Sequence, residues 1–64
     1  MKIILPDQAP KEIEFGHGTV SNLLKELGIN PLEVLVSRNG TLVPEETVIG
    51  REDEIRVIRI AHGG

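Results

Sequence analysis

The pair Gly63 and Gly64 at the end of this 64-residue sequence could take part in a reaction through its position alone. Glycine makes up about 7% of residues in proteins, so a glycine pair ends roughly one chain in two hundred by chance. Such an end is thin and unbranched, and it can enter a channel where any side chain would clash. A partner enzyme could present this carboxylate to the α-phosphate of ATP, and a sulfur or amine nucleophile could attack the acyl-adenylate. A frayed terminus or a cloning remnant is the alternative, and the two glycines alone leave both open.

The other reactive side chains do not form a recognisable catalytic set. The serines are Ser21 and Ser37, the histidines are His17 and His62, and there is no cysteine. A cysteine nucleophile, a disulfide and a zinc–thiolate site are therefore excluded, and two distant histidines make a poor metal site. A filled core of this length also leaves no room for a ligand pocket of roughly 300 Å³. We expect a protein that is not an enzyme and that binds no metal or cofactor.

The charge and hydropathy of the chain narrow the classes of partner. The net charge is −3, and the seven Lys and Arg residues do not cluster beyond Arg56 and Arg59, which disfavours nucleic acid. No apolar run approaches the ~18 residues needed to span a bilayer, and the first apolar stretch is too short for a signal peptide. The acidic residues of 45–54 are interpreted as a solvated loop, with an acidic docking patch left open. We predict a cytoplasmic monomer without a membrane or nucleic-acid partner.

One helix is predicted over residues 20–27. Its apolar positions recur at i, i+3, i+4 and i+7, which gives one apolar stripe: Val20, Leu23, Leu24 and Leu27. Thr19 can cap the first turn through its hydroxyl, and Gly28 stands where a left-handed C-terminal cap is needed. The preceding Gly16-His17-Gly18 is only a fragment of a phosphate-binding loop, so we interpret it as a strand-to-helix turn.

Five strands are predicted from β-branched or alternating residues between turn residues. They are Lys2–Leu5, Glu12–Phe15, Glu33–Arg38, Thr41–Val43 and Ile55–Ile60. Asn39-Gly40 predicts a tight hairpin, because both residues tolerate a positive φ. The first and last strands are the most apolar, so we expect them side by side in the sheet centre. One helix over one mixed sheet is an α+β fold with the strand order of a β-grasp. Residues 1–61 would form this domain, and 62–64 a flexible tail.

Six segments occur together in a specific order and spacing. They are Leu23–Pro31, Glu33–Val36, Asn39-Gly40, Val43–Glu45, Asp53–Val57 and Gly63-Gly64. With them the chain resembles, over nearly its whole length, the ubiquitin-like β-grasp proteins that end in Gly-Gly. These are the sulfur carriers of thiamine and molybdopterin synthesis, the ubiquitin-related modifier and the small archaeal modifier proteins. The lack of Trp and the compact Val43-to-Ile55 segment look more like the archaeal modifiers, without excluding the other carriers.

The resemblance implies a protein carrier and not a catalyst. Gly64 would be adenylated by a ubiquitin-activating-type enzyme that uses ATP, and then converted to a thiocarboxylate or an isopeptide bond. Gly63 and His62 would be its flexible approach. The further partners would be a sulfur-accepting enzyme of tRNA thiolation, molybdopterin or thiamine synthesis, or the lysines of target proteins. The acceptor, and whether the chain's own lysines are modified, stay open.

Strand alternation predicts two faces of the sheet. The residues expected to face the helix are Ile3, Leu5, Ile13, Phe15, Val34, Val36, Ile55 and Val57. The residues expected in a partner-binding face are Ile4, Leu35, Arg56 and Ile58, with Arg59 and Ile60 nearer the tail. Exposed apolar residues ringed by arginine are typical of docking surfaces. The alternative for Ile58 is simple packing at a covered edge.

A second function remains open from the sequence. A non-catalytic β-grasp binding module with an incidental Gly-Gly end would show the same core pattern and the same exposed residues. Its partner would bind equally well after removal of Gly63 and Gly64, whereas a carrier would lose its reaction.

Overall fold

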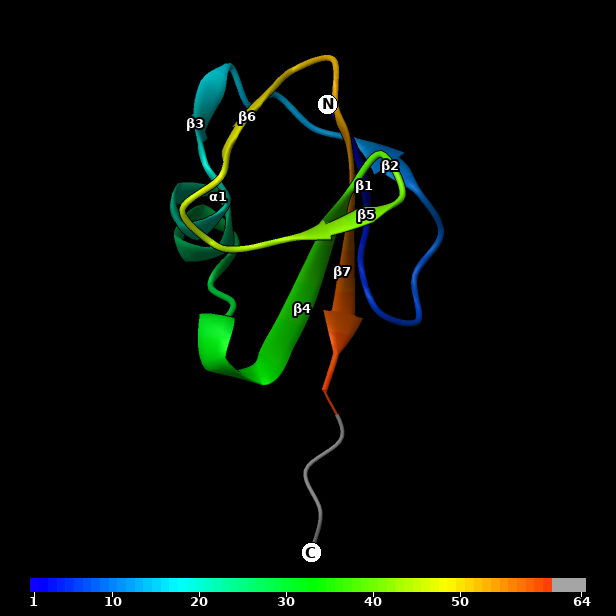
Figure 1. Ribbon diagram of the computed structural model, residues 1–64. Coiled ribbons are helices and arrows are strands. Elements are labelled where there is room, and N and C mark those ends of the chain that lie inside the picture. The colour runs from blue at the N-terminus through cyan, green and yellow to red at the C-terminus, as the bar shows by residue number, and fades with distance from the viewer. Residues whose placement is uncertain (61–64) are drawn as a thin grey trace, which may run out of the picture.

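The computed structural model describes residues 1–60, so Ala61 and the predicted tail 62–64 lie outside the described residues. The helical elements are α1 (Val20–Leu27) and the 3₁₀ helix η1 (Pro31–Glu33). The strands are β1 (Lys2–Ile4), β2 (Lys11–Glu12), β3 (His17–Thr19), β4 (Val34–Arg38), β5 (Thr41–Val43), β6 (Val48–Gly50) and β7 (Glu54–Arg59). Five strands form a mixed sheet in the order β2-β1-β7-β4-β5, with α1 on one side of it (Figure 1). The predicted α+β arrangement of one helix on a mixed sheet is confirmed.

The first and last strands lie side by side in the middle of the sheet, as predicted. β1 pairs with β7 in parallel, with Ile3 opposite Ile55, and neither side chain is accessible to solvent. β7 pairs on its other side with β4 in antiparallel, with Val36 opposite Val57. Central strands are the most covered part of a sheet, which is why the most apolar segments occupy the centre of this one.

Both ends of α1 are capped as the sequence predicts. The Thr19 hydroxyl accepts a hydrogen bond from the Asn22 N–H at 3.1 Å, and the Asn22 side-chain oxygen accepts from the Thr19 N–H at 3.0 Å. Gly28 has a φ of 72°, and the following Ile29 N–H donates to the Leu24 carbonyl at 2.9 Å. These bonds satisfy backbone groups that a helix of eight residues leaves unpaired at its ends.

The predicted helix-facing residues all belong to the core or pack against it. Those that are buried are Ile3, Phe15, Val36, Ile55 and Val57, and those that are partly buried are Leu5, Ile13 and Val34. The helix adds Val20, Leu23 and Leu24, and the core also contains Met1 and Ile49. The core is aliphatic apart from Phe15, as the composition requires.

The strand predicted at Glu12–Phe15 is wrong in its bounds. β2 ends at Glu12, and only Ile13 continues the pairing, by exchanging backbone hydrogen bonds with Met1 at 2.9 and 3.1 Å. The chain then leaves β1 to reach β3. Phe15 therefore enters the core from outside a regular strand, with 6% of its surface exposed.

The segment predicted as a turn at Gly16–Gly18 contributes a strand. β3 pairs with β6 in antiparallel, with Gly18 opposite Ile49 and Thr19 opposite Val48. An added Cβ at Gly18 would lie 3.0 Å from the Phe15 ring and 3.1 Å from the Asn22 side-chain oxygen. Close packing therefore favours glycine at this position, and phosphate binding is not needed to explain it.

A network of hydrogen bonds joins the β4–β5 hairpin to the loop before β7. Asn39 has a φ of 51° in the predicted tight turn, and its side-chain oxygen accepts from the Glu54 N–H at 2.8 Å. The Asn39 amide donates to Asp53 at 3.2 Å, and the Gly50 N–H donates to Asp53 at 2.9 Å. The Gly50 hydrogen bond is the main cause that lowers the pKa of Asp53, with smaller contributions from Asn39 and Arg38.

We predict that Asp53→Ala lowers the free energy of unfolding by roughly 1–2 kcal/mol at pH 7, since it removes charged hydrogen bonds. The lowered pKa of Asp53 means that its contribution is complete above the ordinary value of 3.8 and is lost as pH falls through the folded-state pKa. Urea unfolding of the two proteins from pH 7 to pH 2.5 should show a difference that shrinks below about pH 4. Glu52→Ala, which alters an exposed neighbour, is the control, and an equal loss in both variants would contradict the assignment.

Candidate partner-binding face

The face of the sheet that points away from α1 brings four predicted residues together on three neighbouring strands. Leu35 on β4 lies opposite Ile58 on β7, and Ile4 on β1 lies opposite Arg56 on β7. We call the set Ile4, Leu35, Arg56 and Ile58 the outer face. Each alternates along its strand with a residue of the core, so burial of the core directs these side chains outward.

The outer face is apolar at its centre and accessible to solvent. Leu35 is 47% exposed and Ile58 is 39% exposed, while Ile4 is half-buried and Arg56 is exposed. Adjacent aliphatic side chains beside an arginine match the composition of docking surfaces, where charged residues stand around an apolar centre. The four residues therefore share one face of the sheet as predicted, and their role in partner binding stays a prediction.

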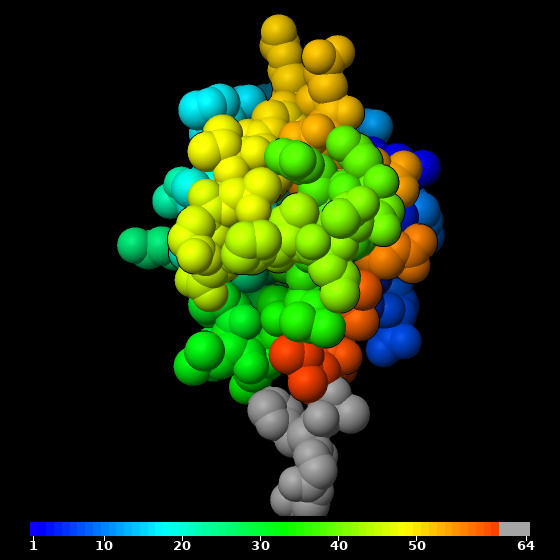
Figure 2. Space-filling model, viewed as in Figure 1, coloured from blue at the N-terminus to red at the C-terminus, as the bar shows by residue number. Residues whose placement is uncertain are grey.

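Leu42 on β5 extends the outer face and was missed from the sequence. It is 57% exposed and lies opposite Ser37, which has the same orientation as Leu35 on β4. Residues of this hairpin, in yellow-green, are at the surface beside β4 in Figure 2. The tight turn at Asn39-Gly40 fixes this register, so the position of Leu42 could have been found from the turn.

Arg59 and Ile60 lie at the end of the outer face and not within it. Alternation along β7 places Arg59 on the helix side, together with Val57. Ile60 follows β7, is half-buried, and its N–H donates to the Glu33 carbonyl at 2.9 Å. The predicted tail residues His62, Gly63 and Gly64 lie outside the described residues, as does Ala61.

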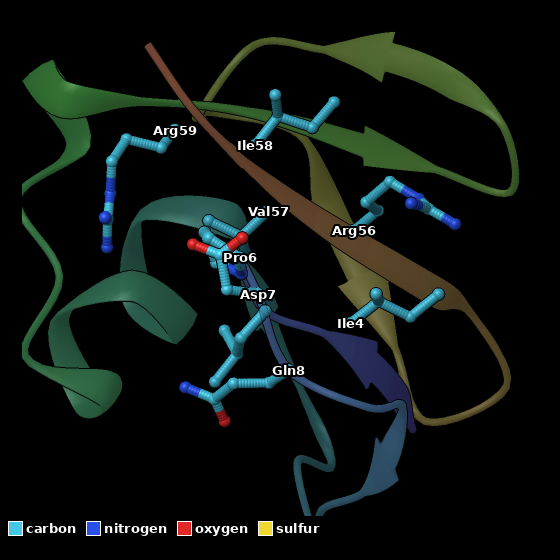
Figure 3. Close-up of a pocket in the computed structure, with 9 residues that line it drawn as sticks. Ile4, Pro6, Asp7, Gln8, Arg56, Val57, Ile58 and Arg59 are labelled. Atoms are coloured by element: carbon cyan, nitrogen blue, oxygen red, sulfur yellow. The ribbon is translucent and has the colours of Figure 1, made fainter. Parts of the chain in front are cut away.

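An open groove of about 480 Å³ borders the outer face, which corrects the expectation that no such hollow could form. It lies between the turn after β1 and the second half of β7, and is lined by Ile4, Leu5, Pro6, Asp7, Gln8, Arg56, Val57, Ile58 and Arg59. Arg56 and Ile58 extend from one side of β7 and Val57 from the other, beside Pro6, while Ile4 belongs to the neighbouring strand β1 (Figure 3). The groove lies open on the surface, which is why a filled core did not exclude it.

The guanidinium groups of Arg56 and Arg59 have no carboxylate within ion-pair distance among residues 1–60. The ion pairs found there join the Met1 amino group to Glu12 at 3.5 Å and Lys2 to Glu54 at 3.6 Å. Both arginines are exposed, so each can meet an anionic group of a partner.

Residues 1–60 contain neither a metal-binding cluster nor a membrane-spanning helix. No group of three His, Asp or Glu side chains in this part of the chain is placed to hold a metal ion. Its helices are also too short or too polar to cross a membrane.

A protein-family model and two curated proteins are similar to this chain. The model described as small archaeal modifier protein 2 matches residues 2–61. An uncharacterized protein of Archaeoglobus fulgidus is 34% identical over 64 residues, which is 100% of this chain and 94% of that protein. The sulfur carrier protein TtuB of Thermus thermophilus is 32% identical over 65 residues and is matched over 100% of both lengths.

A solved structure has the same fold. The crystal structure of the thiamine biosynthesis protein ThiS from Geobacter metallireducens matches with a TM-score of 0.68 over 100% of both chains. The identity is 20%, so this likeness establishes the fold alone, and the β-grasp fold predicted from the sequence is confirmed.

We predict that two isoleucines of β7 differ sharply in their contribution to stability. Ile58→Ala should lower the free energy of unfolding by about 1 kcal/mol or less, because Ile58 is partly exposed. Ile55→Ala should cost about 2–5 kcal/mol, because it leaves a cavity in the core. Chemical denaturation gives the free energy of unfolding of each variant, and the two values are comparable because the same substitution is made in the same strand. Equal losses would mean that Ile58 is a packing residue and that the outer face is covered.

Proposed function

This chain belongs to the small archaeal modifier protein 2 family, and we propose that it is a ubiquitin-like carrier whose Gly64 carboxylate is activated by a partner enzyme. The observation that carries the proposal is the Gly63-Gly64 end on a chain that aligns with a named sulfur carrier over the full length of both. The absence of cysteine fits this role, because the sulfur would be held on the terminal carbonyl.

The proposed chemistry needs no catalytic side chain from this protein. A carboxylate oxygen of Gly64 attacks the α-phosphate of ATP on the partner enzyme, and pyrophosphate leaves. Hydrosulfide supplied by a partner then attacks the acyl carbon and AMP leaves, which gives a thiocarboxylate. If a lysine amine of another protein attacks instead, the product is an isopeptide bond. The name of the Thermus relative favours the first outcome and that of the family favours the second, and both proceed from the same adenylate.

The position of the outer face supports its use as the surface that the activating enzyme recognises. The outer face includes two residues of β7, the strand that leads toward Gly64. Gly64 is the fifth residue after Arg59, so an extended chain places it at most about 18 Å from Arg59. An enzyme that holds the outer face would therefore hold the reacting carboxylate within a limited radius. We further propose that this takes place in the cytoplasm, where ATP and the partner enzymes would be found.

We predict that deletion of Gly64 abolishes activation and leaves the domain stable, because the described core lies within residues 1–60. The measurement is the intact mass after incubation with a cognate adenylating enzyme, ATP and a sulfur source. The full chain should gain an adenylate or exchange one oxygen for sulfur, and the shortened chain should do neither. Absence of both products from the full chain, with an enzyme that is active on its own carrier, would refute the proposal. A binding module without carrier function would give that result and still bind its partner.

We also predict that Leu35→Glu raises the KM of the adenylating enzyme for this carrier by tenfold or more, because it buries a charge at an apolar contact. Leu32→Glu is the matched control: Leu32 is 79% exposed but belongs to η1, outside the outer face. Its KM should stay within twofold of the unmodified chain. Equal KM values for the two variants would show that the enzyme contacts another surface.

A further inference from the structure

The central strand β7 has neighbours on both sides over only its first half. β1 pairs with Glu54–Arg56, whereas β4 pairs with Ile55–Arg59. Val34 lies opposite Arg59, and the bond at this end of the ladder runs from the Ile60 N–H to the Glu33 carbonyl. In an antiparallel pair this pattern means that the N–H and C=O of Arg59 point away from β4. Val57, two residues earlier, has the same orientation, and its N–H faces the Ile4 carbonyl at the end of β1.

The turn after β1 explains why no strand pairs with the second half of β7 on that side. Pro6 has no N–H and cannot extend a ladder along β7. The Gln8 N–H donates to the Leu5 carbonyl at 3.2 Å, and Asp7 takes a φ of 58°, so the chain turns away. The pairing of β1 with β7 ends at Ile4 and Arg56, and outside the strand ladders no backbone hydrogen bond within residues 1–60 involves Arg59. We call Val57–Arg59 the open edge of β7.

Hollows lie on both sides of the open edge. The groove of about 480 Å³ described above runs along it, and a second hollow of about 230 Å³ lies toward the end of α1. Pro6, Val57 and Arg59 line both. Successive side chains of an added strand would point alternately to the two sides, so the edge offers space for each of them.

The side chains at the open edge indicate the kind of segment that would fit. Arg56 stands on the outer side and Arg59 on the helix side, and neither is ion-paired within residues 1–60. Ile4 and Ile58 add apolar surface on the outer side. Asp7 and Glu33 also line the hollows, one in each, but they lie within ion-pair distance of neither arginine. Acidic side chains on both sides of the added strand, with aliphatic ones between them, would complement this surface.

We propose that the open edge of β7 binds an extended acidic segment of a partner protein by strand addition. The segment lies beside Val57–Arg59, where β1 no longer pairs with β7. It accepts a hydrogen bond from the Arg59 N–H and donates one to the Arg59 carbonyl. Its carboxylates meet Arg56 and Arg59. This interaction does not depend on the chemistry of Gly64.

The probe is a capped synthetic hexapeptide of alternating glutamate and valine, titrated into the isotope-labelled chain and followed by amide NMR. The largest shift changes are expected at residues 5–8 and 57–59, and a rise of NaCl from 0.05 to 0.5 M should weaken binding at least threefold. Arg59→Pro should raise the Kd at least tenfold, because it removes the N–H that faces the peptide. Proline is tolerated where a strand N–H points away from its ladder.

Arg59→Glu is the second variant, since it keeps the backbone donor and reverses the charge; it should raise the Kd at least fivefold. Arg51→Glu, at an exposed arginine in the loop after β6, is the matched control and should leave the Kd unchanged. A lysine–valine hexapeptide should not bind.

Shifts centred on β5, an unchanged Kd for both Arg59 variants, or no binding at millimolar peptide would overturn the proposal. The chain without Gly64 should bind the peptide equally well, so failure of activation and failure of the open edge are separate results.

Discussion

The parallel pairing of β1 with β7 is the interaction on which the rest of the structure depends. It joins the two ends of the domain, and it places Ile3 and Ile55 at the centre of the core. Parallel strands cannot be joined by a tight turn, so all the elements between them form one long connection. Within it, α1 is too short to be stable alone and is held by burial of Val20, Leu23 and Leu24 against the sheet.

One helix covers one face of the sheet, and this is why the other face is available to a partner. A domain of this size buries only about 60% of the surface that its unfolded chain exposes. The apolar residues of the covered face form the core, while Leu35 and Ile58 are 47% and 39% exposed and are expected to contribute little to stability. Substitutions on the outer face are therefore separable from folding, which is the property that a recognition surface on a small carrier needs.

Local chemistry made most of the fold predictable from the sequence. The caps at Thr19 and Gly28 and the turn at Asn39-Gly40 each depend on a few neighbouring residues, and all three were predicted. β3 and β6 were missed because their pairing joins distant segments, one of them a glycine-rich stretch without strand character. The place of Phe15 in the core was predicted from alternation, but its strand was not formed, since burial of a ring does not require a ladder. The outer face and the helix-side position of Arg59 follow from alternation, whereas the groove depends on where β1 ends, which the sequence marks only by Pro6.

The early end of β1 has a consequence for how the strand that leads to Gly64 is held. Beyond Arg56, β7 is attached to the sheet through β4, and the Ile60–Glu33 hydrogen bond adds a contact to the end of η1. Extension of β1 would bury this part of β7 between two strands and would stabilise it further. The turn at Pro6 and Asp7 prevents that, although Asp7 takes a left-handed conformation that is unfavourable for a residue with a side chain. The fold therefore lacks possible ladder hydrogen bonds next to the segment that leads to Gly64. The missing pairing beyond Arg56 leaves the core intact, because Ile3 and Ile55 lie in the first half of β7, where β1 and β7 are paired.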